Sequence, residues 1–118
     1  MNNHKLKEVD KLINSNKINE AQAQLAQLGS EYFKNSEYLY LRSKIFFINK
    51  LYYVALDTLL IALEFEKNEK VYALISKIYN TLGNKELEKK IANPDLRSKA
   101  IISLKNELTG ISQKGYEI

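Results

Sequence analysis

Few residues of this chain have the type and spacing that catalysis requires. The sequence contains a single histidine, His4, and no cysteine, so thiolate nucleophiles and thiolate metal ligands are excluded. His4 is close to the N-terminus, in a segment that we expect to be mobile, which argues against a role in catalysis or metal binding. The four glycines are isolated from one another, whereas phosphate-binding loops need clustered glycines.

The acidic residues offer no catalytic pair either. Glu64 and Glu66 are two residues apart, as are Glu86 and Glu88, and residues at that spacing point to different faces of a helix. An enzyme needs acid, base or nucleophile groups that converge on one substrate. We therefore expect no enzymatic activity, no cofactor and no bound metal.

The net charge of +4 raises the question of nucleic acid, but the distribution of the charges argues against it. Lysines alternate with acids, as in the segment 85–90, and the only arginines are Arg42 and Arg97. Arginine is the residue that makes forked contacts with phosphates and bases. Mixed charge runs are typical of solvated helix faces, so we expect no nucleic-acid partner.

Length and composition predict a single small domain over residues 1–118. The N-terminal segment has no apolar core of the kind found in signal peptides. No apolar run is long enough for a membrane span, because charges interrupt the most apolar region at Arg42, Lys44, Lys50, Asp57 and Glu64. The absence of cysteine fits a reducing compartment, and we expect the protein to be cytoplasmic.

The most apolar stretch is Ser36–Glu66, which reads SEYLYLRSKIFFINKLYYVALDTLLIALEFE. Apolar residues recur in it at three- and four-residue spacing, with one break near Asn49 and Lys50, which predicts two antiparallel helices. Both helices are apolar on more than one side and must therefore be covered on more than one side. Neighbouring helices of the chain can cover only part of that surface.

Helices are also predicted before this hairpin. Apolar spacing predicts one over residues 5–14. A second is expected to start at Asn19 as its N-cap and to end with a left-handed Gly29. Residues 30–35 then form a linker.

After the hairpin, helices are predicted over 69–82 and 85–92. Asn93 as cap and proline at the next position predict a closing helix over 94–109, followed by a flexible tail at 110–118. There is no strand signal. The chain is therefore predicted to be all-α, with about seven helices.

The predicted helices show an internal period of 34 residues, which is the period of the tetratricopeptide repeat. The matching pairs are Ala21 and Ala55, Leu25 and Leu59, Leu28 and Ala62, and Leu12 and Phe46. We expect antiparallel hairpins of the tetratricopeptide type, stacked as an α-solenoid, with a closing C-terminal helix. The units are predicted at about 2–35, 36–68 and 69–93, the central one being the most regular.

In such a stack the first helix of each hairpin lines the inner surface. The predicted partner-binding groove is an apolar, aromatic-rich trough with a few lysines, suited to an amphipathic helix. Its residues are Leu6, Ile13, Tyr40, Lys44, Phe47, Ile48, Ala73 and Lys77. The alternative is that Tyr40 and Phe47 are ordinary core residues, covered by the last helix.

The order of these features, from about Leu6 to Leu108, resembles the small co-chaperones of the type III secretion needle subunit. The likeness is best in VYALISKIYNTLGNKELEKKIANPDLRSKAIISLKNEL. The resemblance implies a cytoplasmic chaperone that holds the amphipathic helix of the needle subunit in its concave groove and prevents premature polymerisation. It also implies a second small helical co-chaperone as a partner.

A general adaptor of the tetratricopeptide type, with another helical or extended peptide as its partner, explains the expected fold equally well. A needle-subunit chaperone predicts a complex with two very small proteins. An adaptor predicts a stable monomer or dimer. A nucleic-acid binder, the weaker reading, predicts affinity that falls steeply with salt.

Overall fold

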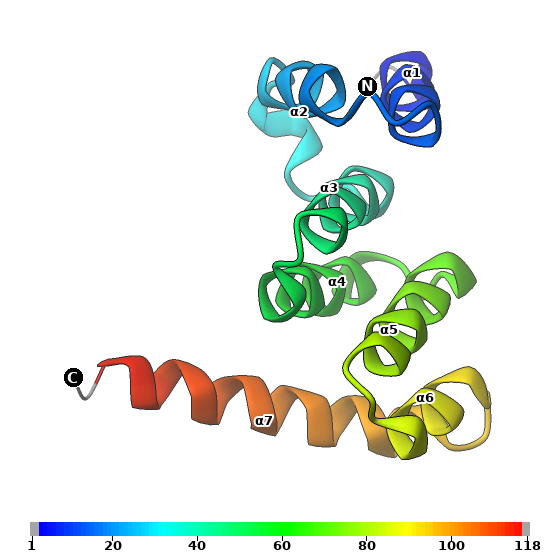
Figure 1. Cartoon of the computed structure of the whole chain (residues 1–118), viewed down its shortest axis with the longest axis vertical. Coiled ribbons are helices and arrows are strands. Elements are labelled where there is room, and N and C mark those ends of the chain that lie inside the picture. The colour runs from blue at the N-terminus through cyan, green and yellow to red at the C-terminus, as the bar shows by residue number, and fades with distance from the viewer. Residues whose placement is uncertain (1–2, 117–118) are drawn as a thin grey trace. The chain divides into compact units, whose positions relative to one another are not determined.

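The computed structural model describes the backbone of residues 3–116 and the side chains of residues 3–109. Within this range the chain is all-α, as predicted, with seven α-helices and one short 3-10 helix (Figure 1). The helices are α1 (Asn3–Asn14), α2 (Ile18–Ala26), α3 (Ser36–Ile48), α4 (Tyr52–Phe65), α5 (Glu69–Thr81), α6 (Lys85–Ala92) and α7 (Arg97–Tyr116), with the 3-10 helix η1 at Ser30–Tyr32.

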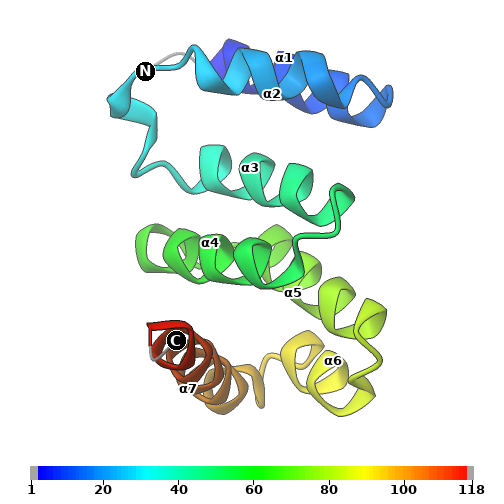
Figure 2. The same cartoon turned by 60° about the vertical axis from the view of Figure 1, so that its left-hand side comes forward.

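The chain divides after Val71 into two compact units, which we call the N-terminal unit and the C-terminal unit. In the N-terminal unit, α1 packs on α2 and α3 packs on α4, and α3 also packs on both α1 and α2. Two views agree that α3 lies between the α1–α2 pair and α4 (Figures 1 and 2). The single domain over residues 1–118 stays a prediction.

Small residues form the centre of the α3–α4 hairpin. Ser43, Ala55 and Ala62 are fully buried, and so is Leu59 between them. The Ser43 hydroxyl donates to the carbonyl oxygen of Leu39 at 2.9 Å, so its burial leaves no unpaired donor. The small side chains let the two helices approach closely, as expected for the central repeat.

The hairpin turns repeat in their backbone conformation. Asn16, Lys50 and Gly83 follow the first helix of each hairpin, and each has a positive φ, of 61°, 63° and 82°. By their numbers they are 34 and 33 residues apart. A left-handed residue at this place is the usual way to end a helix, although glycine is the residue that adopts it without strain.

The hydrogen bonds of the three turns are equivalent as well. In each, the amide after the left-handed residue donates to the carbonyl five residues earlier, which is the Schellman arrangement. The three bonds run from Lys17 to Leu12 (2.8 Å), from Leu51 to Phe46 (2.9 Å) and from Asn84 to Tyr79 (2.9 Å). The repeat predicted from side-chain types is therefore also a repeat of backbone geometry.

Asparagine side chains hold several helix starts. Asn35 accepts from the amide of Tyr38 at 2.9 Å before α3, and Asn84 accepts from Leu87 at 3.1 Å before α6. Asn68 accepts from the amide of Lys70 at 2.8 Å before α5. An asparagine at this position satisfies an amide that has no partner within the helix.

Two predicted helix ends are wrong. Asn19 is not a cap: α2 already begins at Ile18, with Lys17 before it and no side-chain cap, because the Schellman turn delivers the chain directly into the helix. Gly29 is not left-handed: its φ is −73° and its ψ is 172°, so it is an extended residue that precedes η1.

The closing helix has other bounds than predicted. The Asn93 side chain accepts from the amide of Asp95 at 2.9 Å, and residues 94–96 form a turn rather than helix. The helix α7 therefore begins at Arg97 and continues past residue 109 to Tyr116. The predicted flexible tail at 110–118 extends beyond the described residues, since the structure does not describe 117 and 118.

In the C-terminal unit α6 packs on α7. Ser76 of α5 donates to the carbonyl oxygen of Glu88 in α6 at 2.8 Å. The guanidinium of Arg97 lies 4.1 Å from the centre of the Tyr72 ring and donates to the carbonyl of Ala92 at 3.3 Å. Arg97 is thus buried among partners at the start of α7.

Candidate functional site

The structure places the predicted groove residues in different environments. Leu6 and Ile13 are buried, with 2% and 6% of their surface exposed, so they lie beneath the surface of the N-terminal unit. Tyr40, Lys44 and Phe47 are half-buried on α3. Only Ile48, Ala73 and Lys77 are exposed.

Ala73 and Lys77 belong to the C-terminal unit. The site described here is formed by the N-terminal unit alone, and their part in a groove stays a prediction. The residues that lie together around Tyr40 form what we call the inner face: Leu6 and Asp10 of α1, Glu37, Tyr40 and Lys44 of α3, and Lys70 at the start of α5.

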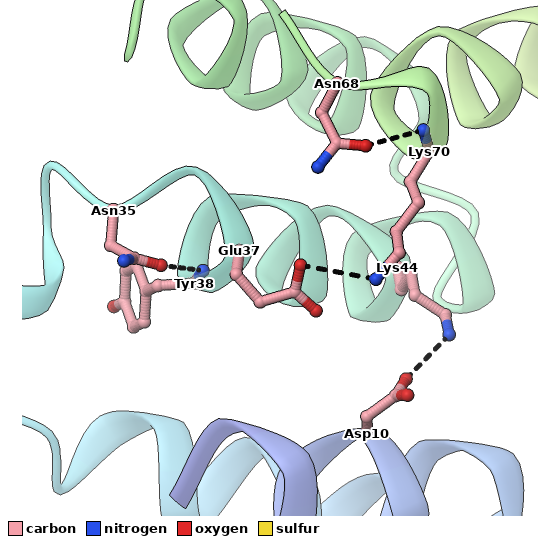
Figure 3. A network of polar contacts seen from close by, with 7 residues as sticks. All are labelled: Asp10, Asn35, Glu37, Tyr38, Lys44, Asn68 and Lys70. Atoms are coloured by element: carbon pink, nitrogen blue, oxygen red, sulfur yellow. Dashed lines mark hydrogen bonds and ion pairs between the residues drawn. The ribbon is translucent and has the colours of Figure 1, made fainter. Parts of the chain in front are cut away.

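Two ion pairs join neighbouring first helices across the inner face (Figure 3). The Nζ of Lys44 lies 3.1 Å from Oδ1 of Asp10, which joins α3 to α1. The Nζ of Lys70 lies 3.7 Å from Oε2 of Glu37, which joins α5 to α3. The first pair is the better buried, with 21% of the Lys44 side chain and 42% of the Asp10 side chain exposed.

Sequence reasoning missed Asp10, Glu37 and Lys70. A signal was present, because Asp10 and Lys44 are 34 residues apart and Glu37 and Lys70 are 33 apart, the same spacings as the hairpin turns. Opposite charges at equivalent positions of consecutive repeats meet where the first helices lie side by side.

Tyr40 lies at the centre of the inner face. Its ring centre is 5.6 Å from the Nζ of Lys44 and 5.9 Å from the Nζ of Lys70, so two cations contact one aromatic ring. Burial raises the pKa of the Tyr40 phenol, the positive charge of Lys70 lowers it, and the carboxylates of Asp10 and Glu37 raise it further. The net shift is upward, so the phenol stays protonated and able to donate a hydrogen bond.

A pocket of about 570 Å³ opens beside these residues. It is lined from α1, from the start of α3 and from the connection between α4 and α5. The expectation of an apolar trough with a few lysines needs correction here, because the lining is mostly polar and carries charges of both signs. The lining residues are Asn3, Leu6, Lys7, Asp10, Asn35, Glu37, Glu66, Asn68 and Lys70.

A second pocket, of about 320 Å³, lies on another side of α3 and is largely apolar. We call it the α2–α3 groove, and its lining comes from α2, from the segment around η1 and from α3. Sequence reasoning missed it because Phe33 was expected to be tucked beneath a linker. Tyr32 is indeed buried, but 52% of Phe33 is exposed.

Other residues considered for chemistry are not gathered into a site. His4 lies in the first turn of α1, not in a mobile segment, with its Nε2 3.2 Å from Glu8. Among the described residues there is no group of three or more potential metal ligands. Within that same part of the chain, no helix has the length and apolarity that crossing a membrane requires.

Comparison with known proteins identifies no relative. No family model, no curated protein and no solved structure matches this chain. Arguments about its function therefore rest on the surfaces described above.

Proposed function

We propose that this chain is a helical-repeat module that binds a segment of a protein partner along its inner face. The observation that carries the proposal is the arrangement around Tyr40, where two lysines contact one ring and each lysine pairs with a carboxylate of another helix. Surface ion pairs of this kind contribute about 0–1 kcal/mol. A partner can therefore exchange its own charged groups for them at little cost.

The mixed charge of the pocket favours a peptide over a nucleic acid. Lys44 and Lys70 would receive carboxylates of the partner, while Asp10 and Glu37 would receive its amines or amides. Tyr40 adds an apolar ring face and a hydroxyl donor. A polyanion would instead meet repulsion from the two carboxylates, which stand among the lysines at 3.1 Å and 3.7 Å.

The specific form of this proposal is a cytoplasmic chaperone of a type III secretion needle subunit. The resemblance of the chain's features supports it, as does the all-α hairpin architecture. Such a partner offers an amphipathic helix, whose apolar side would need Tyr40, Phe47 and the exposed Ile48. The second candidate is a general adaptor, which the polar pocket favours because it suits an extended or charged peptide.

Co-expression with the short open reading frames beside the gene, followed by size-exclusion chromatography, tests the specific form. A chaperone is expected to elute with one or two very small helical proteins and to be poorly soluble alone. A soluble monomer that retains no such protein would contradict the chaperone and leave the adaptor.

The inner face itself is tested by Tyr40→Glu, with Tyr53→Glu as the matched control. Both are tyrosines of the N-terminal unit, but Tyr53 lies on α4 and is 45% exposed, away from the inner face. We expect Tyr40→Glu to abolish capture of a partner from the co-expression while helical content by circular dichroism is kept. Equal capture by both variants would contradict the proposal, and loss of the fold in Tyr40→Glu alone would show that Tyr40 is a core residue.

A further inference from the structure

The α2–α3 groove is apolar and open within the N-terminal unit. Phe33 stands at its edge with 52% of its surface exposed, and Leu28 and Phe46 are half-buried in its lining. The ring of Phe33 lies 5.8 Å from that of Tyr38, so the exposed aromatic is held in place by a neighbour. Exposed aromatic side chains beside a pocket are typical of the anchor points of protein interfaces.

One cation lines this groove. The guanidinium of Arg42 lies 5.5 Å from the centre of the Phe46 ring, and its NH1 donates to the Tyr38 hydroxyl at 3.5 Å. These contacts come from residues four positions before and after it on α3, so the charged group is oriented along the helix. Its remaining donors are available to a ligand, since guanidinium carries five N–H groups.

Arg42 has no internal counter-charge. Among the described residues no carboxylate pairs with it, and no residue that lines the α2–α3 groove is acidic. Lys44, two residues further along the same helix, pairs with Asp10. The groove therefore presents an uncompensated positive charge beside apolar surface.

From this combination we propose that the α2–α3 groove binds an amphipathic helix of a second protein that carries an acidic residue. An aromatic or aliphatic side chain of that helix enters the groove between Phe33 and Phe46, and a carboxylate one turn away forms a forked pair with Arg42. The pocket of about 320 Å³ is large enough for one such anchor side chain.

Charge complementarity favours this partner over the alternatives. The chain has a net charge of +4, so a second copy would bring a positively charged protein to Arg42. A nucleic acid would find a single cation in a largely apolar lining. An acidic helix instead satisfies both features at once, since arginine pairs with carboxylates through two parallel hydrogen bonds.

Two synthetic helical peptides serve as probes, followed by NMR chemical shifts of the full-length chain. One carries a Phe and, four residues away, a Glu, and the other has Lys in place of that Glu. The acidic peptide is expected to bind, with shifts at Phe33, Arg42 and Phe46, and the lysine peptide to bind about tenfold more weakly or worse. Equal affinity of the two peptides, or shifts confined to Tyr40 and Lys44, would overturn the proposal.

Arg42→Gln tests the same pair from the side of the protein. It is expected to lower the affinity for the acidic peptide about tenfold, whereas Lys11→Gln, which removes one exposed positive charge from α1, keeps it. The two peptides used on the unchanged chain need no variant to fold. Self-association in sedimentation experiments that disappears in Phe33→Asp would assign the groove to a second copy and overturn the proposal. None of these variants changes Tyr40, so failure here is distinguishable from failure of the inner face.

Discussion

Two faces of the same helix handle charge in opposite ways. On the inner face, Lys44 of α3 pairs with Asp10, and Glu37 of α3 pairs with Lys70. On the face that lines the α2–α3 groove, Arg42 contacts aromatic rings only. The first face is electrically balanced by its own neighbours, while the second leaves a positive charge for a partner.

The difference follows from what lies next to each face. The inner face of α3 adjoins the first helices of the neighbouring hairpins, where equivalent positions place charged groups opposite one another. The other face adjoins α2 and the segment around η1, which contribute mainly apolar side chains to the groove. Because α3 is apolar on several sides, both faces depend on a buried residue between them.

Leu41 is that residue, fully buried between Tyr40 and Arg42 in the sequence. Leu41→Ala is expected to lower the free energy of unfolding by about 2–5 kcal/mol, because it removes buried methyl groups and leaves a cavity. Urea unfolding measures the loss, and Ile48→Ala on the exposed end of α3 is the control. Binding at both faces should weaken together. A variant that lost only one face would show that the two are not supported by a common core.

The turn after α3 offers a gain instead of a loss. Lys50 has a φ of 63°, which costs roughly 1–2 kcal/mol for a residue with a side chain. Lys50→Gly should raise the free energy of unfolding by roughly 0.5–1 kcal/mol, since glycine's greater freedom in the unfolded chain offsets part of the relief.

The equivalent glycine is the matched control for this turn. Gly83 has a φ of 82°, and a Cβ there would meet no atom within 4 Å, so Gly83→Ala isolates the backbone term. It should lower the free energy of unfolding by about 1 kcal/mol. If Lys50→Gly were destabilising in urea, the three turns would not be energetically equivalent.

A double-mutant cycle of Asp10→Asn and Lys44→Gln sharpens the contrast in charge. The coupling free energy should be about 0.2–1 kcal/mol and should shrink in high salt, since the pair is partly exposed. Arg42→Gln should leave the salt dependence of the stability unchanged, because no described carboxylate pairs with Arg42. Equal salt effects in Arg42→Gln and Lys44→Gln would remove the distinction between the faces.

The smallest effect concerns the ionisation of Tyr40. Because its pKa is raised on folding, mainly by burial, the phenol should titrate above its ordinary range. Its contribution to stability is fully present below the unfolded pKa and is lost as the pH rises through the folded pKa. Tyrosinate absorbance, compared between the unchanged chain, Tyr40→Phe and Tyr53→Phe, measures it. A normal titration of Tyr40 would show that the inner face does not bury it.

Much of the fold could be predicted because its signals are local. The breaks after residues 14, 49 and 82 follow from asparagine and glycine, and the spacing of apolar residues identifies the helices between them. The ends that were mispredicted depend on hydrogen bonds between turns. Gly29, for example, has the type of a helix stop but lies in extended backbone before η1.

The site was harder, because its residues come from different helices. Leu6 and Tyr40 stand at equivalent positions, yet Leu6 is buried and Tyr40 is half-buried, since each position has different neighbours. Side-chain type alone could not distinguish the two. Nor could it show that Phe33 is exposed while Tyr32, beside it in the chain, is buried.

The sequence by itself determined the helices, their hairpin turns and the repeat spacing of 34 and 33 residues, because these depend on short-range backbone preferences and apolar periodicity. Only the tertiary structure decided which charges are paired. Whether a lysine or an arginine of α3 finds a carboxylate depends on which helix packs against its side. Asp10 lies opposite Lys44, and Arg42 has only aromatic rings and apolar side chains around it.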